Sequence, residues 1–290
     1  MIRIEIGRQH YLLYLLLSHP RKMALLSPES RARLDEINQR FNEAIYSGPS
    51  AAGYDTIHGY AEDAQHDYPA RGLIERVWAG GGYGRALELG AGSGFFTALI
   101  ARNAEQVIAV EPVPDLGRVL RDRCRAEGLD NVEVVAATAQ DLDGRVPAAS
   151  IDTAFVIQSL HHFHRRPEVF GVLARLVRPG GRLLLLEPHH NLLRVARLWR
   201  KYRSTYHARE FWTNERNWAT HDFVTRGELI ALSRAAGFER PRITGYWIPF
   251  SRRLVDEAAS RFRLESRLGR VPGLRHVARV LALEAWRAAR

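Results

Sequence analysis

Three glycines alternate with other residues in the stretch ELGAGSGFF, which runs from Glu88 to Phe96. A glycine-rich turn that opens a helix lets the backbone approach a nucleotide-like ligand, because glycine has no side chain to block it. A triphosphate-binding loop requires Gly-Lys-Ser/Thr, whereas Gly94 is followed by two phenylalanines. A dinucleotide-binding loop has a third glycine three residues after the second, and Phe95 occupies that position. The spacing therefore argues against both a nucleoside triphosphatase and a standard dinucleotide site.

A carboxylate stands at the end of the next apolar run. The run VIAVEP includes Glu111, which follows Gly90 by 21 residues. A carboxylate at the end of a second strand is placed to accept hydrogen bonds from both hydroxyls of a ribose. The glycine loop and Glu111 together predict an adenosine-containing ligand.

Candidate acid–base groups follow two later apolar runs. Gln158, His161 and His162 come after IDTAFV, and Glu187 and His189 come after GRLLLL. Histidine is suited to proton transfer near neutral pH. The alternative is structural, since these histidines could instead cap or pack the loops that carry them.

The elements that must position these residues alternate between short apolar runs and helical patterns. Expected strands are RALELG, QVIAVEP, NVEVVAA, IDTAFVIQ and GRLLLLEP, and expected helices begin near Phe95 or span Leu116–Glu127 and Val169–Val177. Continuously apolar strands separated by helices indicate a parallel sheet covered on both faces. The pattern predicts a doubly wound α/β core.

The two ends of the chain complete this core. Residues 30–46 have apolar side chains at helical spacing, which predicts a helical N-terminal cap over residues 1–79 and a core over 80–290. Thr225 and Glu228 form a capping-box pattern before a helix that stops at Gly237, and RITGYWIPF follows as a strand candidate. The last run, RVLALEAWRA, fits a strand or a helix equally well.

Composition narrows the class of protein. The 290 residues are 46% hydrophobic and 26% charged, as in a globular protein, and the one cysteine, Cys124, leaves no disulfide framework and favours a reducing cytoplasm. The net charge of +10 comes mainly from scattered arginines, which indicates a solvated surface, with a polyanion or membrane partner as the alternative. The run at residues 11–17, YLLYLLL, is too short to span a membrane, so we expect a buried helix or an element on a membrane surface.

From about Ala86 to Phe250, the chain resembles the class I S-adenosylmethionine-dependent methyltransferases, particularly those acting on small molecules, quinones and lipids. The motifs are ALELGAGSG for the cofactor loop, AVEP for the ribose-binding acid, VVAATAQDL for the adenine segment, and IDTAFVIQSLHHF and LVRPGGRLLLLEP for the fourth and fifth strands. The resemblance implies a Rossmann-like, doubly wound, seven-stranded and mainly parallel sheet with a helical N-terminal cap and an inserted lid. It also makes RVLALEAWRA an antiparallel seventh strand.

The resemblance implies S-adenosyl-L-methionine as the cofactor and no metal. The implied cofactor-binding residues are Glu88, Gly90, Ala91, Gly92, Gly94, Glu111, Pro112, Thr138, Ala139, Gln140 and Gln158. Many relatives have an acidic residue for the adenine amino group where this chain has Thr138, whose hydroxyl can still accept a hydrogen bond. Asp141 also falls within the adenine segment.

Methyl transfer requires the protein to hold an acceptor atom in line with the methyl group and to remove its proton if it has one. We expect His161 nearest the acceptor, with His162 almost equally placed. Residues 189–223 are rich in aromatic side chains, which predicts a lid over the acceptor, and residues 251–275 predict a second, basic insertion of amphipathic helix. The expected substrate contacts are Tyr54, Glu187, His189, Tyr206, His207 and Trp212, with Tyr60 and Tyr68 also enclosing the acceptor.

The function expected from these features is methylation of an oxygen or carbon atom of a hydrophobic small molecule. The alternatives are a quinone or lipid methyltransferase at the membrane surface, an RNA methyltransferase, and a cofactor-binding protein without transfer activity. Gln158 to His161 lack the Asn/Asp-Pro-Pro-aromatic motif used on base nitrogens, so a nucleic-acid partner is disfavoured. The sequence leaves open a peripheral membrane contact and a homodimer.

Overall fold

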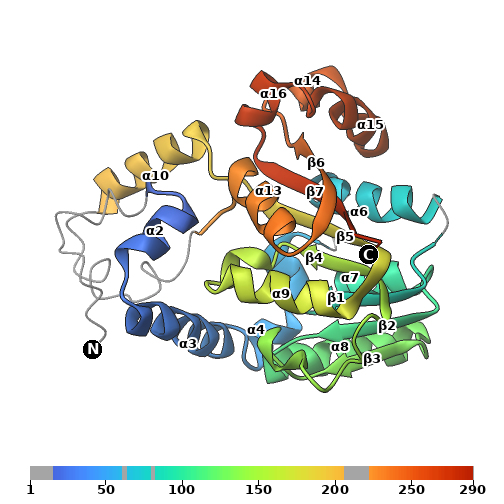
Figure 1. Cartoon of the computed structure of the whole chain (residues 1–290). Coiled ribbons are helices and arrows are strands. Elements are labelled where there is room, and N and C mark those ends of the chain that lie inside the picture. The colour runs from blue at the N-terminus through green and yellow to red at the C-terminus, as the bar shows by residue number, and fades with distance from the viewer. Residues whose placement is uncertain (1–15, 61–63, 80–81, 206–221, 290) are drawn as a thin grey trace.

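The structure is a computed structural model, which describes residues 16–60, 64–79, 82–205 and 222–289. Helices at the N-terminus precede the sheet (Figure 1): α2 (His19–Leu25), α3 (Pro28–Ile45), α4 (Pro49–Ala52), α5 (Tyr54–His58) and α6 (Ala64–Ala79). The long helix α3 begins with Pro28 in its first turn, and the Ser27 hydroxyl accepts a hydrogen bond from the amide of Ser30 at 3.2 Å. These are standard signals for a helix start.

Seven strands form one sheet in the order β3-β2-β1-β4-β5-β7-β6. They are β1 (Arg85–Leu89), β2 (Gln106–Val110), β3 (Val132–Val135), β4 (Ile151–Ile157), β5 (Val177–Pro188), β6 (Phe238–Tyr246) and β7 (Val280–Arg287). The first five strands pair in parallel, and β7 pairs antiparallel with both β5 and β6. The predicted doubly wound, mainly parallel sheet is confirmed, and the ambiguous run RVLALEAWRA is a strand.

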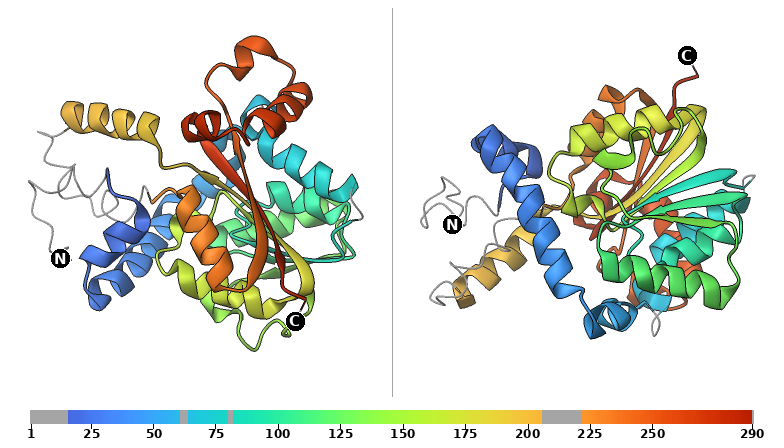
Figure 2. Two further views of the ribbon diagram at one scale, coloured as in Figure 1. Left: turned by 45° about the horizontal axis from the view of Figure 1, so that its top comes forward. Right: turned by 90° about the horizontal axis from the view of Figure 1, so that it is seen from below.

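Helices cover both faces of this sheet (Figure 2). They are α7 (Phe95–Ala101), α8 (Pro114–Glu127), α9 (Arg166–Leu176) and α13 (Arg226–Ala235), with short 3-10 turns η2 (Gln140–Leu142) and η3 (Leu160–His162). One face packs against α9 and α13 through Leu173 and Leu229. The other packs against α6, α7 and α8 through Ile74, Ile100 and Leu120. The helix α6 contacts α7, so it belongs to this covering layer rather than to the cap made by α2 to α5.

Two insertions leave the carboxyl side of the sheet. The first contains α10 (Leu192–Thr205), and the second contains α14 (Ser251–Leu254), α15 (Ala258–Leu268) and α16 (Pro272–Val277). The second insertion, predicted as amphipathic helix over residues 251–275, is divided into separate helices, because the carboxylate of Glu257 accepts hydrogen bonds from the amides of Ala259 and Ser260 and starts α15. As a result Leu254 is exposed, whereas Phe262 is buried.

The strand predicted from RITGYWIPF is displaced in the structure. Strand β6 begins earlier, at Phe238, and ends at Tyr246, and Trp247 then adopts a left-handed backbone with φ +57°. The capping box is present, since the Thr225 hydroxyl accepts from the amide of Glu228 and the Glu228 carboxylate accepts from the amide of Thr225. No helix in the described ranges is both long and apolar enough to cross a membrane. The apolar run predicted as a buried or membrane-surface element lies almost entirely outside those ranges.

Candidate active site

The glycine loop connects β1 to α7 in a conformation that only glycine adopts easily. Gly90, Gly92 and Gly94 have φ values of +73°, +57° and +80°. A Cβ atom at Gly90 would lie 2.5 Å from Cβ of Ser159, and one at Gly92 would lie 3.4 Å from the ring of Tyr54. The loop is therefore a bare backbone surface that a side chain would fill.

Glu111 lies directly after β2 and only 5% of its surface is exposed. One carboxylate oxygen accepts from the amide of Gly92 at 2.8 Å, and the other accepts from the amide of Val113 at 2.8 Å. Burial raises the pKa of Glu111 to about 7, against the two amide donors. Each oxygen retains a lone pair, so Glu111 can fix the loop and still accept a hydrogen bond from a ligand hydroxyl.

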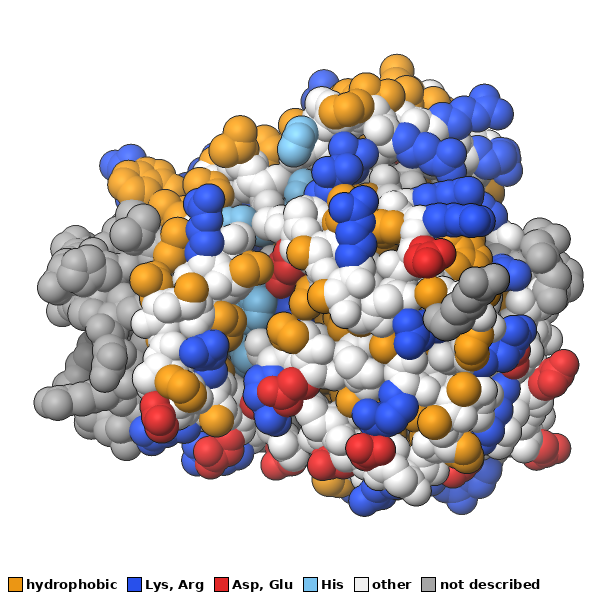
Figure 3. All heavy atoms as spheres, in the orientation of Figure 1, with side chains coloured by type: hydrophobic (Ala, Val, Ile, Leu, Met, Phe, Trp, Pro, Cys, Tyr) orange, Lys and Arg blue, Asp and Glu red, His pale blue; other side chains and the backbone are white. Residues whose placement is uncertain are grey.

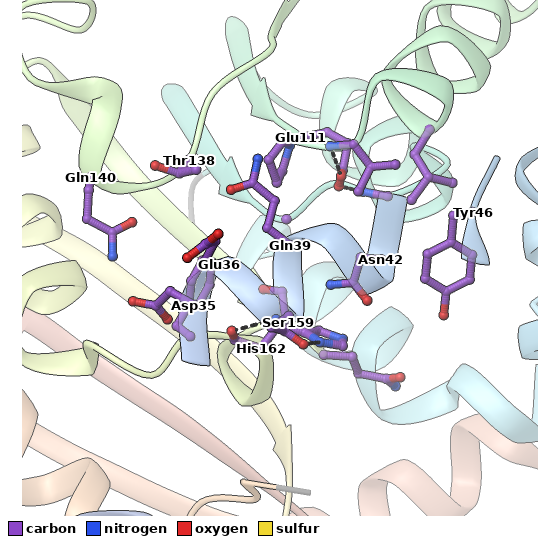
Figure 4. Close-up of a pocket in the computed structure, with 18 of the residues that line it drawn as sticks. Asp35, Glu36, Gln39, Asn42, Tyr46, Glu111, Thr138, Gln140, Ser159 and His162 are labelled. Atoms are coloured by element: carbon purple, nitrogen blue, oxygen red, sulfur yellow. Dashed lines mark hydrogen bonds between the residues drawn. The ribbon is translucent and has the colours of Figure 1, made fainter. Parts of the chain in front are cut away.

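A cavity of about 340 Å³ opens beside the loop and Glu111 (Figure 4). Seven of the predicted cofactor residues line it: Gly90, Gly92, Glu111, Pro112, Thr138, Gln140 and Gln158. The predicted Glu88, Ala91, Gly94 and Ala139 do not line it. Glu88, in β1 just before the loop, is 2% exposed and accepts a hydrogen bond from the Thr97 hydroxyl at 2.5 Å, and burial raises the pKa of Glu88 to about 8.

The opposite wall of the cavity is α3, which the sequence analysis did not assign to the site. Asp35, Glu36, Gln39 and Asn42 line the cavity, and Figure 4 shows Gln39 lying between Thr138 and Glu111 on one side and the histidine turn on the other. Positions 35, 39 and 42 share one helical face beside the apolar stripe that buries Leu34. In the sequence, the row of amide and carboxyl side chains beside the buried face of this helix could have indicated that α3 lines the site.

The far end of the cavity contains the predicted adenine segment. The Thr138 hydroxyl donates to a carboxylate oxygen of Asp141 at 2.6 Å, which leaves the hydroxyl oxygen of Thr138 able to accept a hydrogen bond. Gln158 directly follows β4 and has φ +52°, and its side-chain oxygen accepts a hydrogen bond from the Tyr60 hydroxyl at 3.2 Å. A left-handed backbone at a residue other than glycine costs about 1–3 kcal/mol and is typical of functional sites.

His161 and Glu187 form a pair at the ends of β4 and β5. Glu187 is fully buried, and one of its oxygens accepts from the amides of Ser159 and Leu160 at 2.7 and 2.6 Å. Its other oxygen lies 2.8 Å from Nδ1 of His161. In the neutral imidazole, the carboxylate partner favours the proton on Nδ1 and leaves the lone pair at Nε2, for which no hydrogen bond is found within the described chain. Glu187 was predicted to contact the substrate. In the structure its carboxylate is buried and is bonded to backbone amides and to His161, so it does not face the cavity.

His162 lies nearer the cavity than His161. It lines the cavity, its ring centroid is 4.1 Å from that of His161, and its carbonyl oxygen accepts from the side-chain amide of Asn38 at 2.9 Å. The ring of Phe223 meets His161 edge-on at 6.0 Å. The two histidines predicted as catalytic thus lie together between the cavity and the segment that returns from the first insertion.

Other predicted substrate residues are distributed differently. Tyr54 lines the cavity, whereas His189 is buried beside β7, with Nδ1 3.0 Å from the carbonyl oxygen of Ala278, and burial lowers the pKa of His189 to about 4. Tyr68 is also away from the cavity, since its hydroxyl donates to Glu265 in the second insertion. Tyr206, His207 and Trp212 lie outside the described residues. Within α10, the predicted lid residue Trp199 is 47% exposed on the outer surface.

A buried ion-pair cluster joins the cap to this region. One oxygen of Asp222 lies 2.5 Å from Nζ of Lys22, and the other lies 3.0 and 3.2 Å from Nδ1 of His19 and His164. Burial opposes ionisation, but the ammonium of Lys22 and the hydrogen bonds from both histidines hold the pKa of Asp222 well below its usual range. His19, His164 and Asp222 have the geometry of a metal-ligand group, yet the Lys22 ammonium already supplies a positive charge to this carboxylate. We assign the cluster a structural role.

The fold and this cavity define an α/β protein that binds an adenosine-type cofactor at the carboxyl ends of its strands. A family model described as a methyltransferase domain matches residues 87–185. The biotin biosynthesis bifunctional protein BioHC of Cellvibrio japonicus is 31% identical over 172 residues, which is 57% of this chain but 31% of that protein. A ubiquinone biosynthesis O-methyltransferase of Xanthomonas euvesicatoria is 28% identical over 193 residues, which is 63% of this chain and 71% of that protein.

A solved structure of phosphoethanolamine N-methyltransferase 2 from Haemonchus contortus, in complex with S-adenosyl-L-methionine, has the same fold. The TM-score is 0.61 at 15% identity, over 87% of this chain and 60% of that one. The fold and the matched methyltransferase domain support a class I S-adenosylmethionine-dependent methyltransferase, with S-adenosylmethionine as the expected cofactor. The bare glycine loop, the buried Glu111 and the 340 Å³ cavity fit this cofactor.

Proposed function

We propose that this methyltransferase acts on an oxygen or carbon atom of a hydrophobic small molecule, and that His161 removes the acceptor proton. The observation that carries the proposal is the His161–Glu187 pair beside the cofactor cavity. S-adenosylmethionine, when bound, supplies an electrophilic methyl group. A hydroxyl or acidic carbon needs a base during transfer, whereas a neutral amine reacts through its own lone pair.

Each residue would then have a definite task. Glu111 and the amides of the glycine loop would hold the cofactor, with Thr138 and Gln140 at the adenine end. Glu187 fixes the ring orientation and the tautomer of His161, in the way that a carboxylate orients the histidine of a catalytic triad. Tyr54 and α3 would close the cavity and exclude water from it.

The test compares Glu187→Gln with His161→Ala and wild type in release of S-adenosylhomocysteine from a panel of phenols, enols and amines. In Glu187→Gln, the amide oxygen can keep the two backbone donors while the amide nitrogen donates to His161 Nδ1. That contact moves the ring proton to Nε2 and removes the base, so turnover of hydroxyl acceptors should fall by about 10²–10⁴-fold, as in His161→Ala. Cofactor affinity, measured by calorimetry, should stay within about threefold of wild type.

Two outcomes would contradict the proposal. Turnover of amine acceptors, with no turnover of any phenol or enol by the wild type, would show that the methylated atom is nitrogen rather than oxygen or carbon. Hydroxyl turnover that is unaffected in His161→Ala would remove this residue from the chemistry. His162→Ala provides a comparison within the same turn, because Nδ1 of His162 lies 3.5 Å from Oδ1 of Asn38 rather than beside a carboxylate. Since His162 lines the cavity, the cofactor affinity of this variant is measured as well.

A quinone or lipid acceptor at the membrane surface is the second candidate. The similarity to a ubiquinone biosynthesis O-methyltransferase supports it. An RNA acceptor methylated at a base nitrogen is disfavoured, because residues 158–161 lack the Asn/Asp-Pro-Pro-aromatic motif used on such nitrogens. We also propose a reducing compartment such as the cytoplasm, since the thiol of Cys124 is free.

A further inference from the structure

Exposed apolar side chains gather on one side of the molecule. Eight large hydrophobic residues of the described chain are strongly exposed, and six of them belong to α10 and to the second insertion. These six are Leu192, Leu193, Trp199, Phe250, Leu254 and Val271. Helices α10 and α16 contact each other, and Figure 1 and the left view of Figure 2 show the two insertions on the upper side of the molecule. The exposed apolar residues thus lie on two neighbouring insertions at the same side of the molecule.

The same region is strongly basic. Helix α10 has five basic residues and no acidic one. Arg197, Arg200 and Arg203 are exposed on it, and the second insertion adds exposed arginines at 252, 253, 263, 267 and 270. Figure 3 shows basic and apolar side chains side by side over α10 and α14 to α16. We call this region, made of α10 and residues 250–271, the basic-apolar surface.

The helical arrangement of α10 puts both kinds of side chain outward. Leu192, Ala196, Trp199 and Arg203 follow one another at i, i+4, i+7 and i+11, and all four are exposed, whereas Leu198 on the other side is buried. A hollow of about 740 Å³ lies along this outer face, lined mainly by apolar side chains and by the arginines at positions 200 and 203. A helix of this type lies in the plane of a lipid interface, with apolar residues among the acyl chains and arginines at the phosphates.

We propose that the basic-apolar surface binds an anionic lipid bilayer. Charge complementarity selects this partner: a second copy of the chain would oppose arginines with arginines. An RNA backbone would pair with the arginines but would leave Leu192 and Leu193 without an apolar environment. The inference is independent of the proposed acceptor, because it concerns a surface outside the cofactor cavity.

The test is flotation of the full-length protein with vesicles of phosphatidylcholine alone or with 30% phosphatidylglycerol. Wild type should float with the anionic vesicles only, and less at 1 M salt than at 0.1 M, because salt shortens the Debye length from about 10 to about 3 Å. The triple variant Arg197→Gln/Arg200→Gln/Arg203→Gln should partition on the order of a hundredfold more weakly. The matched control removes three exposed charges from α8, at positions 118, 121 and 125, on the lower side of Figure 1, and should bind like wild type.

The apolar contribution has its own pair of variants. Leu192→Ser/Leu193→Ser should weaken binding to anionic vesicles by about tenfold or more, while all arginines remain. The control Ile57→Ser changes a residue that is 61% exposed on α5, outside the basic-apolar surface, and should have no effect.

Three results would overturn the proposal. The first is that wild type does not float with anionic vesicles. The second is that the α8 variant loses as much vesicle binding as the α10 variant. Binding would then depend on the net charge of the protein and not on the basic-apolar surface. The third is that the α10 arginine variant binds vesicles as the wild type does but loses another interaction. That interaction would be either salt-sensitive RNA binding or dimerisation, the latter measured by light scattering.

Discussion

Replacement of Asp222 by asparagine should cost about 3–5 kcal/mol of unfolding free energy. The side chains of Asp222 and Lys22 are 0% and 1% exposed, and the pair is separated by 2.5 Å. Asparagine keeps an oxygen for His19 and His164 but leaves the ammonium of Lys22 without a counter-charge. Lys22 must then remain charged in an apolar site or release its proton, and either state is costly when water cannot reach it.

The measurement is thermal and urea unfolding of wild type, Asp222→Asn, Lys22→Met and the double variant. At about 2–4 °C per kcal/mol for a chain of this size, the single Asp222→Asn change should lower Tm by about 10 °C. The double variant contains no buried charge at this contact, so it should recover most of the loss, with a coupling free energy of about 2–3 kcal/mol. A double variant as unstable as Asp222→Asn, or a single variant within about 1 kcal/mol of wild type, would refute the reasoning.

The remaining predictions concern the glycine loop and a helix cap. Burial raises the pKa of Glu88 to about 8, so the folded chain keeps a proton that the unfolded chain releases above pH 4.5, and stability from this group falls between about pH 4.5 and 8. Glu88→Gln should therefore reduce the loss of stability between pH 6 and 8.5 in urea unfolding, and an unchanged loss would count against it. Gly90→Ala should weaken S-adenosylmethionine binding at least about tenfold in calorimetry, because its Cβ would meet Ser159, whereas Gly128→Ala, with similar φ and open space, should not. Thr225→Ala should remove about 1 kcal/mol through loss of the capping box, measured as a Tm decrease of a few degrees.

Much of the sheet could be predicted because its information is local. Each of the runs ending at Leu89, Val110 and Ile157 is mainly apolar and buried on both faces, which is what a strand under two helical layers requires. The start of β6 was missed because Phe238 stands directly after Gly237, next to a charged stretch that looks like a loop. Its antiparallel partner β7 supplies the pairing that local pattern does not reveal.

The pair of His161 and Glu187 shows where the prediction of the site stopped. Both residues were identified from their position after strands, but each was expected to face substrate. Their contact depends on β4 and β5 being neighbours with Ile157 paired to Leu186, a register that sequence spacing alone does not give. The residue types were thus sufficient to predict acid–base chemistry. The role of Glu187 in orienting His161 became apparent only from the pairing of β4 with β5.

The contacts of the N-terminal cap also could not be predicted from the sequence, because they join residues far apart in the chain. These contacts connect the two walls of the cavity. Asp55 of α5 accepts hydrogen bonds from the Ser93 hydroxyl in the glycine loop and from Arg123 of α8, and Asn38 of α3 donates to the histidine turn. One wall of the cavity is therefore the glycine loop, and the other is a helix that precedes it by about fifty residues. Because the cap contacts both the loop and the turn, a ligand that fits between them stabilises all three together. Cofactor binding and order in the cap should consequently be coupled, and the acceptor would meet the histidines only in the arrangement that the cap maintains.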